Sequence, residues 1–126
     1  MASRLGSFTW GAFGAIAVLL AVAIVAPLYT DYRSRAEASD MLVIAEPLQR
    51  AVEAHAAASH TLQGSGAGVK MAPAFFYATV LWDGTIVLRN PNSFGQVIVL
   101  QPTLKAGSVT WQCAGGPARD VPPQCR

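Results

Sequence analysis

The N-terminal part of the chain contains a long block without a charged side chain. No residue from Gly6 to Thr30 carries a charge, and the segment 8–29 has 22 residues. A helix of that length can cross a lipid core about 30 Å thick. We therefore predict a transmembrane helix over residues 7–30, which commits this part of the chain to apolar surroundings.

Residue types within the block indicate how such a helix would pack. Gly11 and Gly14 are among several small residues that would let other helices approach closely, and Pro27 is expected to kink or end the helix. The alternative is a secretory signal peptide, with Arg4 as its basic region and the run 21–23 as its cleavage site. The length of the apolar run and the helical pattern directly after it favour the transmembrane helix.

Beyond Pro27 the pattern becomes that of an amphipathic helix. Apolar or partly apolar residues three or four apart form one stripe, which comprises Met41, Ile44, Leu48, Val52 and His55. Glu46 and Arg50 form an oppositely charged pair four apart on the other side, and Pro47 is expected to bend the helix. We predict that the helix continues to about residue 58, and that 8–58 forms a rod of about 77 Å at about 1.5 Å per residue. The first four residues of the stripe are the predicted contacts with a sheet.

Strand signals separated by turns fill most of the remaining globular part, residues 31–126. A loop over 59–74 precedes a sheet predicted over 75–113, and Asp83-Gly84 supplies a tight hairpin turn within it. The strands are expected at 75–82, 85–89, 97–101 and 108–113. We therefore predict an α+β fold, with a long N-terminal helix (a transmembrane half plus an amphipathic half) packed on a four-stranded antiparallel sheet.

The two cysteines lie close to the C-terminus. Cys113 ends the last predicted strand, and Cys125 is the penultimate residue. An even cysteine count behind an apolar N-terminal segment is typical of an oxidising compartment, and the alternative is two reduced thiols in a cytosolic protein. We predict a disulfide that closes the loop 114–126, which has five Gly and Pro residues and little else to hold it.

Composition and motifs indicate neither catalysis nor a cofactor. The net charge of +2 is too small to predict nucleic-acid binding, and the basic residues form no run. His55 and His60 are five apart, so on a helix they would point to different sides, and no Cys–His cluster accompanies them. The Gly-rich segment 64–68 follows a helix rather than a strand, so it is interpreted as a connector instead of a phosphate cradle. We predict no enzymatic activity, no metal site and no cofactor.

Several segments, taken in order, resemble those of the type IV pilin family. The resemblance is carried by Pro27 followed by Tyr29 and Tyr32 where pilins leave the membrane, by the proline-bent run 46–53, by the last strand at 109–113, and by the closing loop at 120–125. It covers nearly the whole chain. The resemblance implies an assembly helix that includes Gly11, Gly14, Pro27, Tyr29 and Tyr32.

The first residues add a leader and a departure from the family pattern. Residues 1–6, with one arginine and a terminal glycine, resemble a prepilin leader, which implies cleavage between Gly6 and Ser7. Pilins usually carry a glutamate five residues into the mature chain, whereas Gly11 stands there in this sequence. Two alternatives follow: a divergent pilin that packs by apolar contacts alone, and a pilin-like accessory or binding module that stays anchored in the inner membrane.

The resemblance also implies a function, partners and a location. The expected function is that of a structural subunit of a type IV pilus, with roles in adhesion, motility or DNA uptake. The expected partners are further copies of the chain in a helical filament, other pilins, the inner membrane and the pilus assembly machinery, with no specific nucleic acid. The chain would reside in the bacterial inner membrane before assembly and in an extracellular pilus afterwards, with its globular part outside the cytoplasm.

Overall fold

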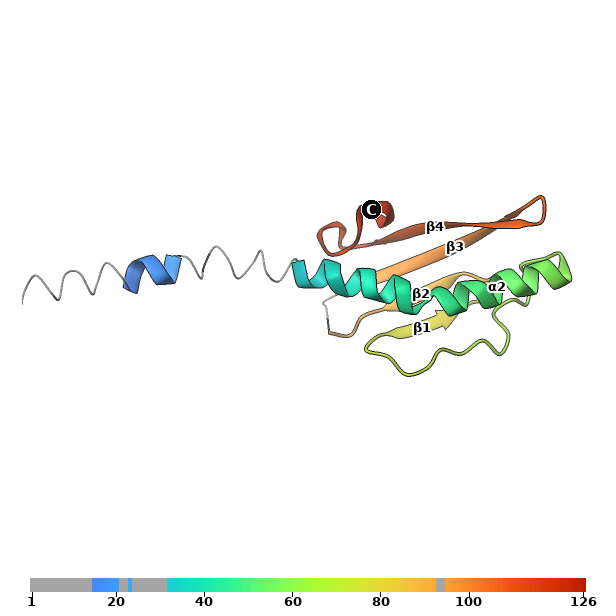
Figure 1. The fold of residues 1–126 in the computed structure, drawn as a ribbon, viewed down its shortest axis with the longest axis horizontal. Helices are drawn as coiled ribbons and strands as arrows, with labels where there is room; N and C mark the ends of the chain where they lie inside the picture. Colours follow the sequence, from blue (N-terminus) through green and yellow to red (C-terminus); the bar gives the residue numbers. More distant parts are fainter. Residues whose placement is uncertain (1–14, 21–22, 24–31, 93–94) are drawn as a thin grey trace, which may run out of the picture. The chain divides into compact units, whose positions relative to one another are not determined.

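The computed structural model describes residues 15–20, 23, 32–92 and 95–126 (Figure 1). The chain divides into two compact units, 1–33 and 34–126. The described residues of the segment 15–23 are helical and exposed. The second unit contains the sheet, the disulfide and most of the described helix.

The predicted long helix with a transmembrane half is wrong. The helix that packs in the globular unit is 28 residues long, over 32–59, and it includes α2 (Glu46–Ser59). Charged side chains occur along its whole length, so it is a surface helix of a globular domain, and no helix in the described part of the chain is long and apolar enough to span a membrane. The residues predicted for leader cleavage and most of those predicted for the assembly helix lie outside the described residues: Gly6, Ser7, Gly11, Gly14, Pro27 and Tyr29.

One stripe of the helix is buried throughout. Its members, three or four residues apart, are Ala38, Met41, Ala45, Leu48, Val52 and Ala56. Burial of Met41, Leu48 and Val52 agrees with the predicted helix–sheet contacts. The prediction for Ile44 is wrong, because its side chain is 39% exposed and the neighbouring Ala45 takes the inward position. Tyr32, at the beginning of the described helix, is also exposed.

A turn interrupts the helical residues close to Pro47. The turn at Ala45 separates helical residues 32–44 from α2, and Pro47 lies in the first turn of α2. Proline is tolerated there because the first N–H groups of a helix have no partner within it. The N–H of Ala45 still donates to the carbonyl of Met41 at 3.0 Å, so the backbone path continues.

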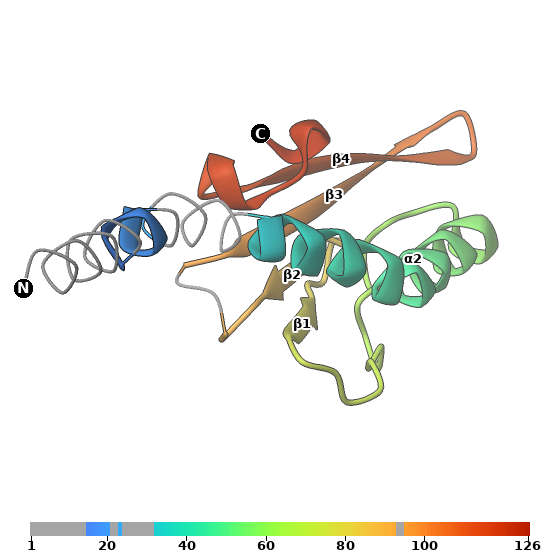
Figure 2. The same cartoon turned by 60° about the vertical axis from the view of Figure 1, so that its left-hand side comes forward.

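The sheet is a four-stranded antiparallel meander, as predicted. Its strands are β1 (Tyr77–Val80), β2 (Ile86–Arg89), β3 (Val97–Lys105) and β4 (Ser108–Gly116), in the order β1-β2-β3-β4. Figures 1 and 2 show the helix lying along one face of this sheet. β3 and β4 are longer than predicted, and together they extend past the end of β2.

The core lies between the helix and the sheet face that it covers. Period-two alternation places Ile86 and Leu88 of β2 on this face, opposite Leu100 and Ile98 of β3, and all four are buried. Two short 3-10 turns follow β4, η1 (Ala118–Asp120) and η2 (Pro123–Cys125). Val121, between the two turns, and Cys125, in η2, belong to the same core.

Pro102 lies inside β3 where the strand has only one partner. β2 pairs with β3 no further than Leu100, whereas β4 pairs through Lys105. Ala106 and Gly107 have φ of 49° and 80°, as in a two-residue type I′ hairpin, which closes on a hydrogen-bonded pair. Pairs alternate, so Pro102 and Trp111 form a non-hydrogen-bonded pair, and the ring nitrogen of Pro102 faces away from β4. A proline is tolerated there because no ladder bond is lost.

Candidate functional site

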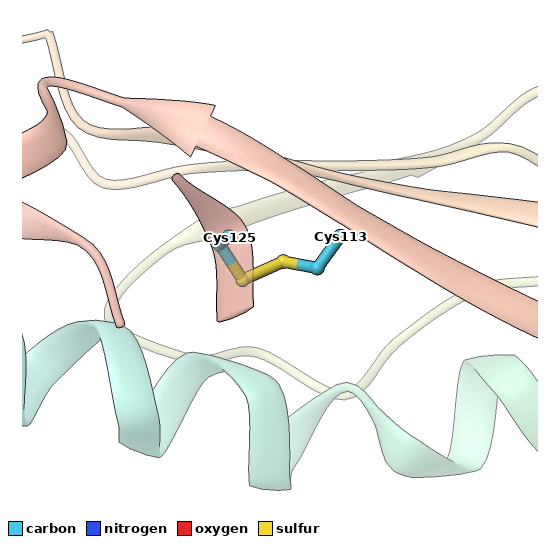
Figure 3. Close-up of a disulfide and its surroundings, with 2 residues drawn as sticks. All are labelled: Cys113 and Cys125. Carbon is cyan, nitrogen blue, oxygen red and sulfur yellow. A yellow bond between two sulfur atoms is a disulfide. The ribbon is translucent and has the colours of Figure 1, made fainter. Parts of the chain in front are cut away.

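A disulfide ties the C-terminal segment to the last strand. Cys113 of β4 and Cys125 of η2 are bonded, with their Cα atoms 4.6 Å apart. Figure 3 shows the bridge between β4 and the helix, and Cys125 is fully buried. The predicted disulfide is confirmed, although the strand continues past Cys113 to Gly116.

The segment after β4 packs so closely against the end of that strand that a side chain at Gly115 would obstruct it. A Cβ added at Gly115 would lie 2.8 Å from the carbonyl oxygen of Val97 and 3.2 Å from Cγ1 of Val121. Val121 is fully buried as a result of this close approach. The segment is therefore an integral part of the core.

A buried carboxamide connects this segment to the helix. Nε2 of Gln96 donates to the carbonyl oxygens of Asp120, at 2.7 Å, and of Ser34, at 2.8 Å. Its Oε1 accepts a hydrogen bond from Nδ2 of Asn90 at 2.8 Å. Gln96 is fully buried, and every side-chain hydrogen-bonding atom of its carboxamide has a partner. One side chain thus holds three parts of the chain together.

Asn90 extends the same network to a charged residue of the helix. Its Nδ2 also donates to Oε2 of Glu37 at 2.9 Å, and its Oδ1 accepts from the N–H of Asn92 at 3.0 Å. The Asn90 N–H donates to the Gln96 carbonyl at 3.0 Å, which closes the loop that the two residues bracket. We call this set the amide junction: Ser34, Glu37, Asn90, Gln96 and Asp120. Sequence reasoning missed it, because 90–96 was treated only as the connection between the strands predicted at 85–89 and 97–101.

The two histidines have different structural roles. Nε2 of His55 lies 3.0 Å from the carbonyl oxygen of Gln63. His60 is the C-cap of α2, with a left-handed φ of 58°. Within the described part of the chain, no three His, Cys, Asp or Glu side chains gather in a way that could hold a metal ion.

The β1–β2 turn differs from the tight two-residue turn that was predicted. The Leu81 N–H donates to the Thr85 carbonyl at 2.8 Å, so three residues form the loop, and Gly84 takes the left-handed position with φ of 86°. The Asp83 carboxylate accepts from the Thr85 N–H at 3.0 Å. This bond, with a further one from the Thr85 side chain, lowers the pKa of Asp83 below its ordinary value.

We expect the contribution of Asp83 to stability to be lost in acid. Because the folded-state pKa is lowered, the ionised carboxylate stabilises the fold above the unfolded-state value of about 4. The contribution disappears as the pH falls through the lower folded-state pKa. Urea unfolding of the wild type and Asp83→Asn should therefore differ at pH 6, and the difference should shrink as the pH falls below about 4. A difference that does not change with pH would contradict this assignment.

The Gly-rich connector is packed against the β1–β2 turn. Ser65 is buried, and the Gly64 N–H donates to the carbonyl of Trp82 at 2.8 Å. A Cβ at Gly66 would lie 2.1 Å from the carbonyl oxygen of Leu81. Only the absence of a side chain allows these two backbones to approach so closely.

Gly66→Ala is expected to destabilise the protein by about 2 kcal/mol, because the added methyl group meets backbone that can yield only by shifting. Gly116→Ala is the matched control, since no atom lies within 4 Å of a Cβ added there. Thermal unfolding followed by circular dichroism measures both. Equal melting temperatures for the two variants would show that the connector does not pack as described.

Comparison with protein-family models and with curated proteins found no match for this chain.

Proposed function

We propose that the protein is a structural subunit of a type IV pilus, in which the unit 34–126 is the globular part of each subunit. The observation that supports this most is the disulfide-closed C-terminal segment beside a helix laid on a four-stranded antiparallel meander. These parts occur in the order in which the pilin resemblance places them. The proposed work of the chain is assembly.

The apolar N-terminal sequence supports an assembly role because its side chains need an apolar partner. Ile16, Val18, Leu19 and Leu20 are each more than half exposed in the isolated chain. Burial of apolar surface contributes roughly 25 cal/mol per Å². In a filament, the same segments of neighbouring copies would bury one another.

The disulfide supports a location outside the cytoplasm. Such bonds persist in oxidising compartments and are rare where thiols are kept reduced. The buried position of Cys125 makes the bond part of the folded core. We therefore place the globular unit on the extracytoplasmic side, with other pilins and the assembly machinery as its partners.

Mass spectrometry of sheared, purified surface filaments tests this proposal. Peptides of this chain, with an N-terminus at Ser7, are the expected result. Recovery of the chain only in the cell-membrane fraction would overturn the filament role and favour the anchored accessory module.

A matched pair of variants isolates the role of the apolar segment. Leu19→Arg should remove the chain from filaments because a charge would enter an apolar interface. Leu19→Ile keeps the side chain apolar and should retain filament incorporation. The Cys113–Cys125 bond, measured by thiol titration, should be intact in both. Normal incorporation of Leu19→Arg would contradict assembly through this segment.

A further inference from the structure

The C-terminal segment is attached to the rest of the fold in two chemically different ways. The covalent attachment is the disulfide at Cys125, twelve positions from Cys113. The other is the hydrogen bond from Gln96 to the Asp120 carbonyl. Gln96 donates its second N–H to the carbonyl oxygen of Ser34 in the helix. The hydrogen bonds that hold the C-terminal segment and the start of the helix therefore come from the same carboxamide.

Because of this shared carboxamide, a movement of the C-terminal segment changes the hydrogen bonds of the helix. If residues 117–126 move away, one N–H of the buried Gln96 loses its acceptor. A buried donor without a partner is unfavourable, so the side chain must turn toward water or water must enter. Either change disturbs its bonds to Ser34 and Asn90.

We propose that residues 117–126 form a redox-controlled latch on the amide junction. With the Cys113–Cys125 bond intact, the segment holds together the helix turn 34–38 and the two amide side chains of Asn90 and Gln96. Reduction by a dithiol frees the segment and loosens both. The opposite end of the helix has a separate bond to the sheet, from Nε1 of Trp111 to Oε1 of Glu53 at 2.8 Å, and stays packed.

The chemistry of release is a thiol–disulfide exchange. A thiolate of the dithiol attacks one sulfur of the bridge, forms a mixed disulfide with that cysteine and displaces the other cysteine as a thiolate, which takes up a proton. The second thiol of the reagent then displaces the first cysteine. The reagent ends as a cyclic disulfide, and Cys113 and Cys125 end as two thiols. Cys113 lines a surface hollow of about 500 Å³ with Gln112 and Gln124.

Hydrogen exchange of the full-length chain, read by mass spectrometry before and after treatment with dithiothreitol, tests the latch. Loss of the disulfide lowers global stability and speeds exchange everywhere by a common factor. The latch adds a local effect, so exchange at 34–38 and at the backbone N–H groups of Asn90 and Gln96 should accelerate at least about tenfold more than exchange at 48–56. Reoxidation should restore the original pattern.

Two results would overturn the proposal. In one, hydrogen exchange accelerates beyond the common factor only in 114–126. The disulfide then fixes that segment without influencing the helix. In the other, every peptide accelerates equally, and the bond then contributes only to global stability. The double variant Cys113→Ser/Cys125→Ser should show the reduced pattern and should not respond to dithiothreitol.

Replacing Gln96 separates the latch from the bond itself. In Gln96→Leu the disulfide remains, yet 34–38 should exchange faster, and reduction should give that turn no acceleration beyond the common factor. Gln101→Leu is the control, because Gln101 is exposed on β3 and should leave the pattern unchanged. If Gln96→Leu does not fold, the comparison of oxidised and reduced wild type still decides the question.

Discussion

Leu48→Asp is expected to destabilise the globular unit severely. Leu48 lies in the middle of the buried helix stripe and is only 3% exposed. The substitution removes a large apolar side chain and places a carboxylate where no described cation is buried, at an expected cost of more than about 4 kcal/mol. Small domains have a free energy of unfolding of about 5–15 kcal/mol, so a loss of this size removes a large share of the stability. Circular dichroism and urea titration measure the effect.

Val43→Asp is the matched control for this experiment. Val43 lies on the same helix, but its side chain is 64% exposed, so a carboxylate there stays in water. Its unfolding free energy should remain within about 0.5 kcal/mol of the wild type. Similar losses in both variants would mean that helix propensity, rather than burial, governs the result. Wild-type stability of Leu48→Asp would contradict the described helix face.

Cys113→Ser is expected to lower the free energy of unfolding by about 3 kcal/mol. The bond closes a short loop, and chain-entropy estimates for a loop of this length give that magnitude. Guanidinium titration of the variant and of the oxidised wild type, without reductant, measures the difference. Reduced wild type is the control and should resemble the variant. An unchanged midpoint in Cys113→Ser would show that the bridge does not stabilise the fold.

The helix face could be predicted in part from the sequence because large apolar residues mark it. Met41, Leu48 and Val52 were identified by their spacing. Ala45 and Ala56 were not, since a methyl side chain carries little hydropathic signal, although both are buried. Ile44 was selected in place of Ala45 because it is larger. Spacing fixes a stripe only to within one residue when alanine alternates with larger side chains.

The amide junction could not be predicted because its bonds join distant parts of the chain. Gln96 is 62 positions from Ser34 and 24 from Asp120. In the sequence, Asn90 and Gln96 only bracket a segment with turn residues, which exposed amides also do. Their burial depends on the C-terminal segment folding back along β4, and that fold-back is a tertiary event.

The error about the long helix has a different origin. An uncharged run measures the apolar content of a segment, but it does not fix whether that segment forms one long helix with the amphipathic residues that follow it. The described helix over 32–59 has charged side chains on its outer side and an alanine-rich inner stripe. The hairpin sequence Asp83-Gly84 gave the right place but the wrong loop length, because the Leu81–Thr85 bond closes the turn one residue earlier.

The position of Pro102 has a consequence for solubility. Beyond Leu100, no strand among the described residues pairs with the side of β3 that faces away from β4. Such an exposed edge can pair with strands of other molecules and so promote aggregation. The proline removes one of the two N–H groups that this stretch would offer, which leaves that of Leu104. A strand of another molecule would find too few N–H donors there to pair with this edge. The part of β3 and β4 that extends past β2 can therefore remain exposed without promoting aggregation.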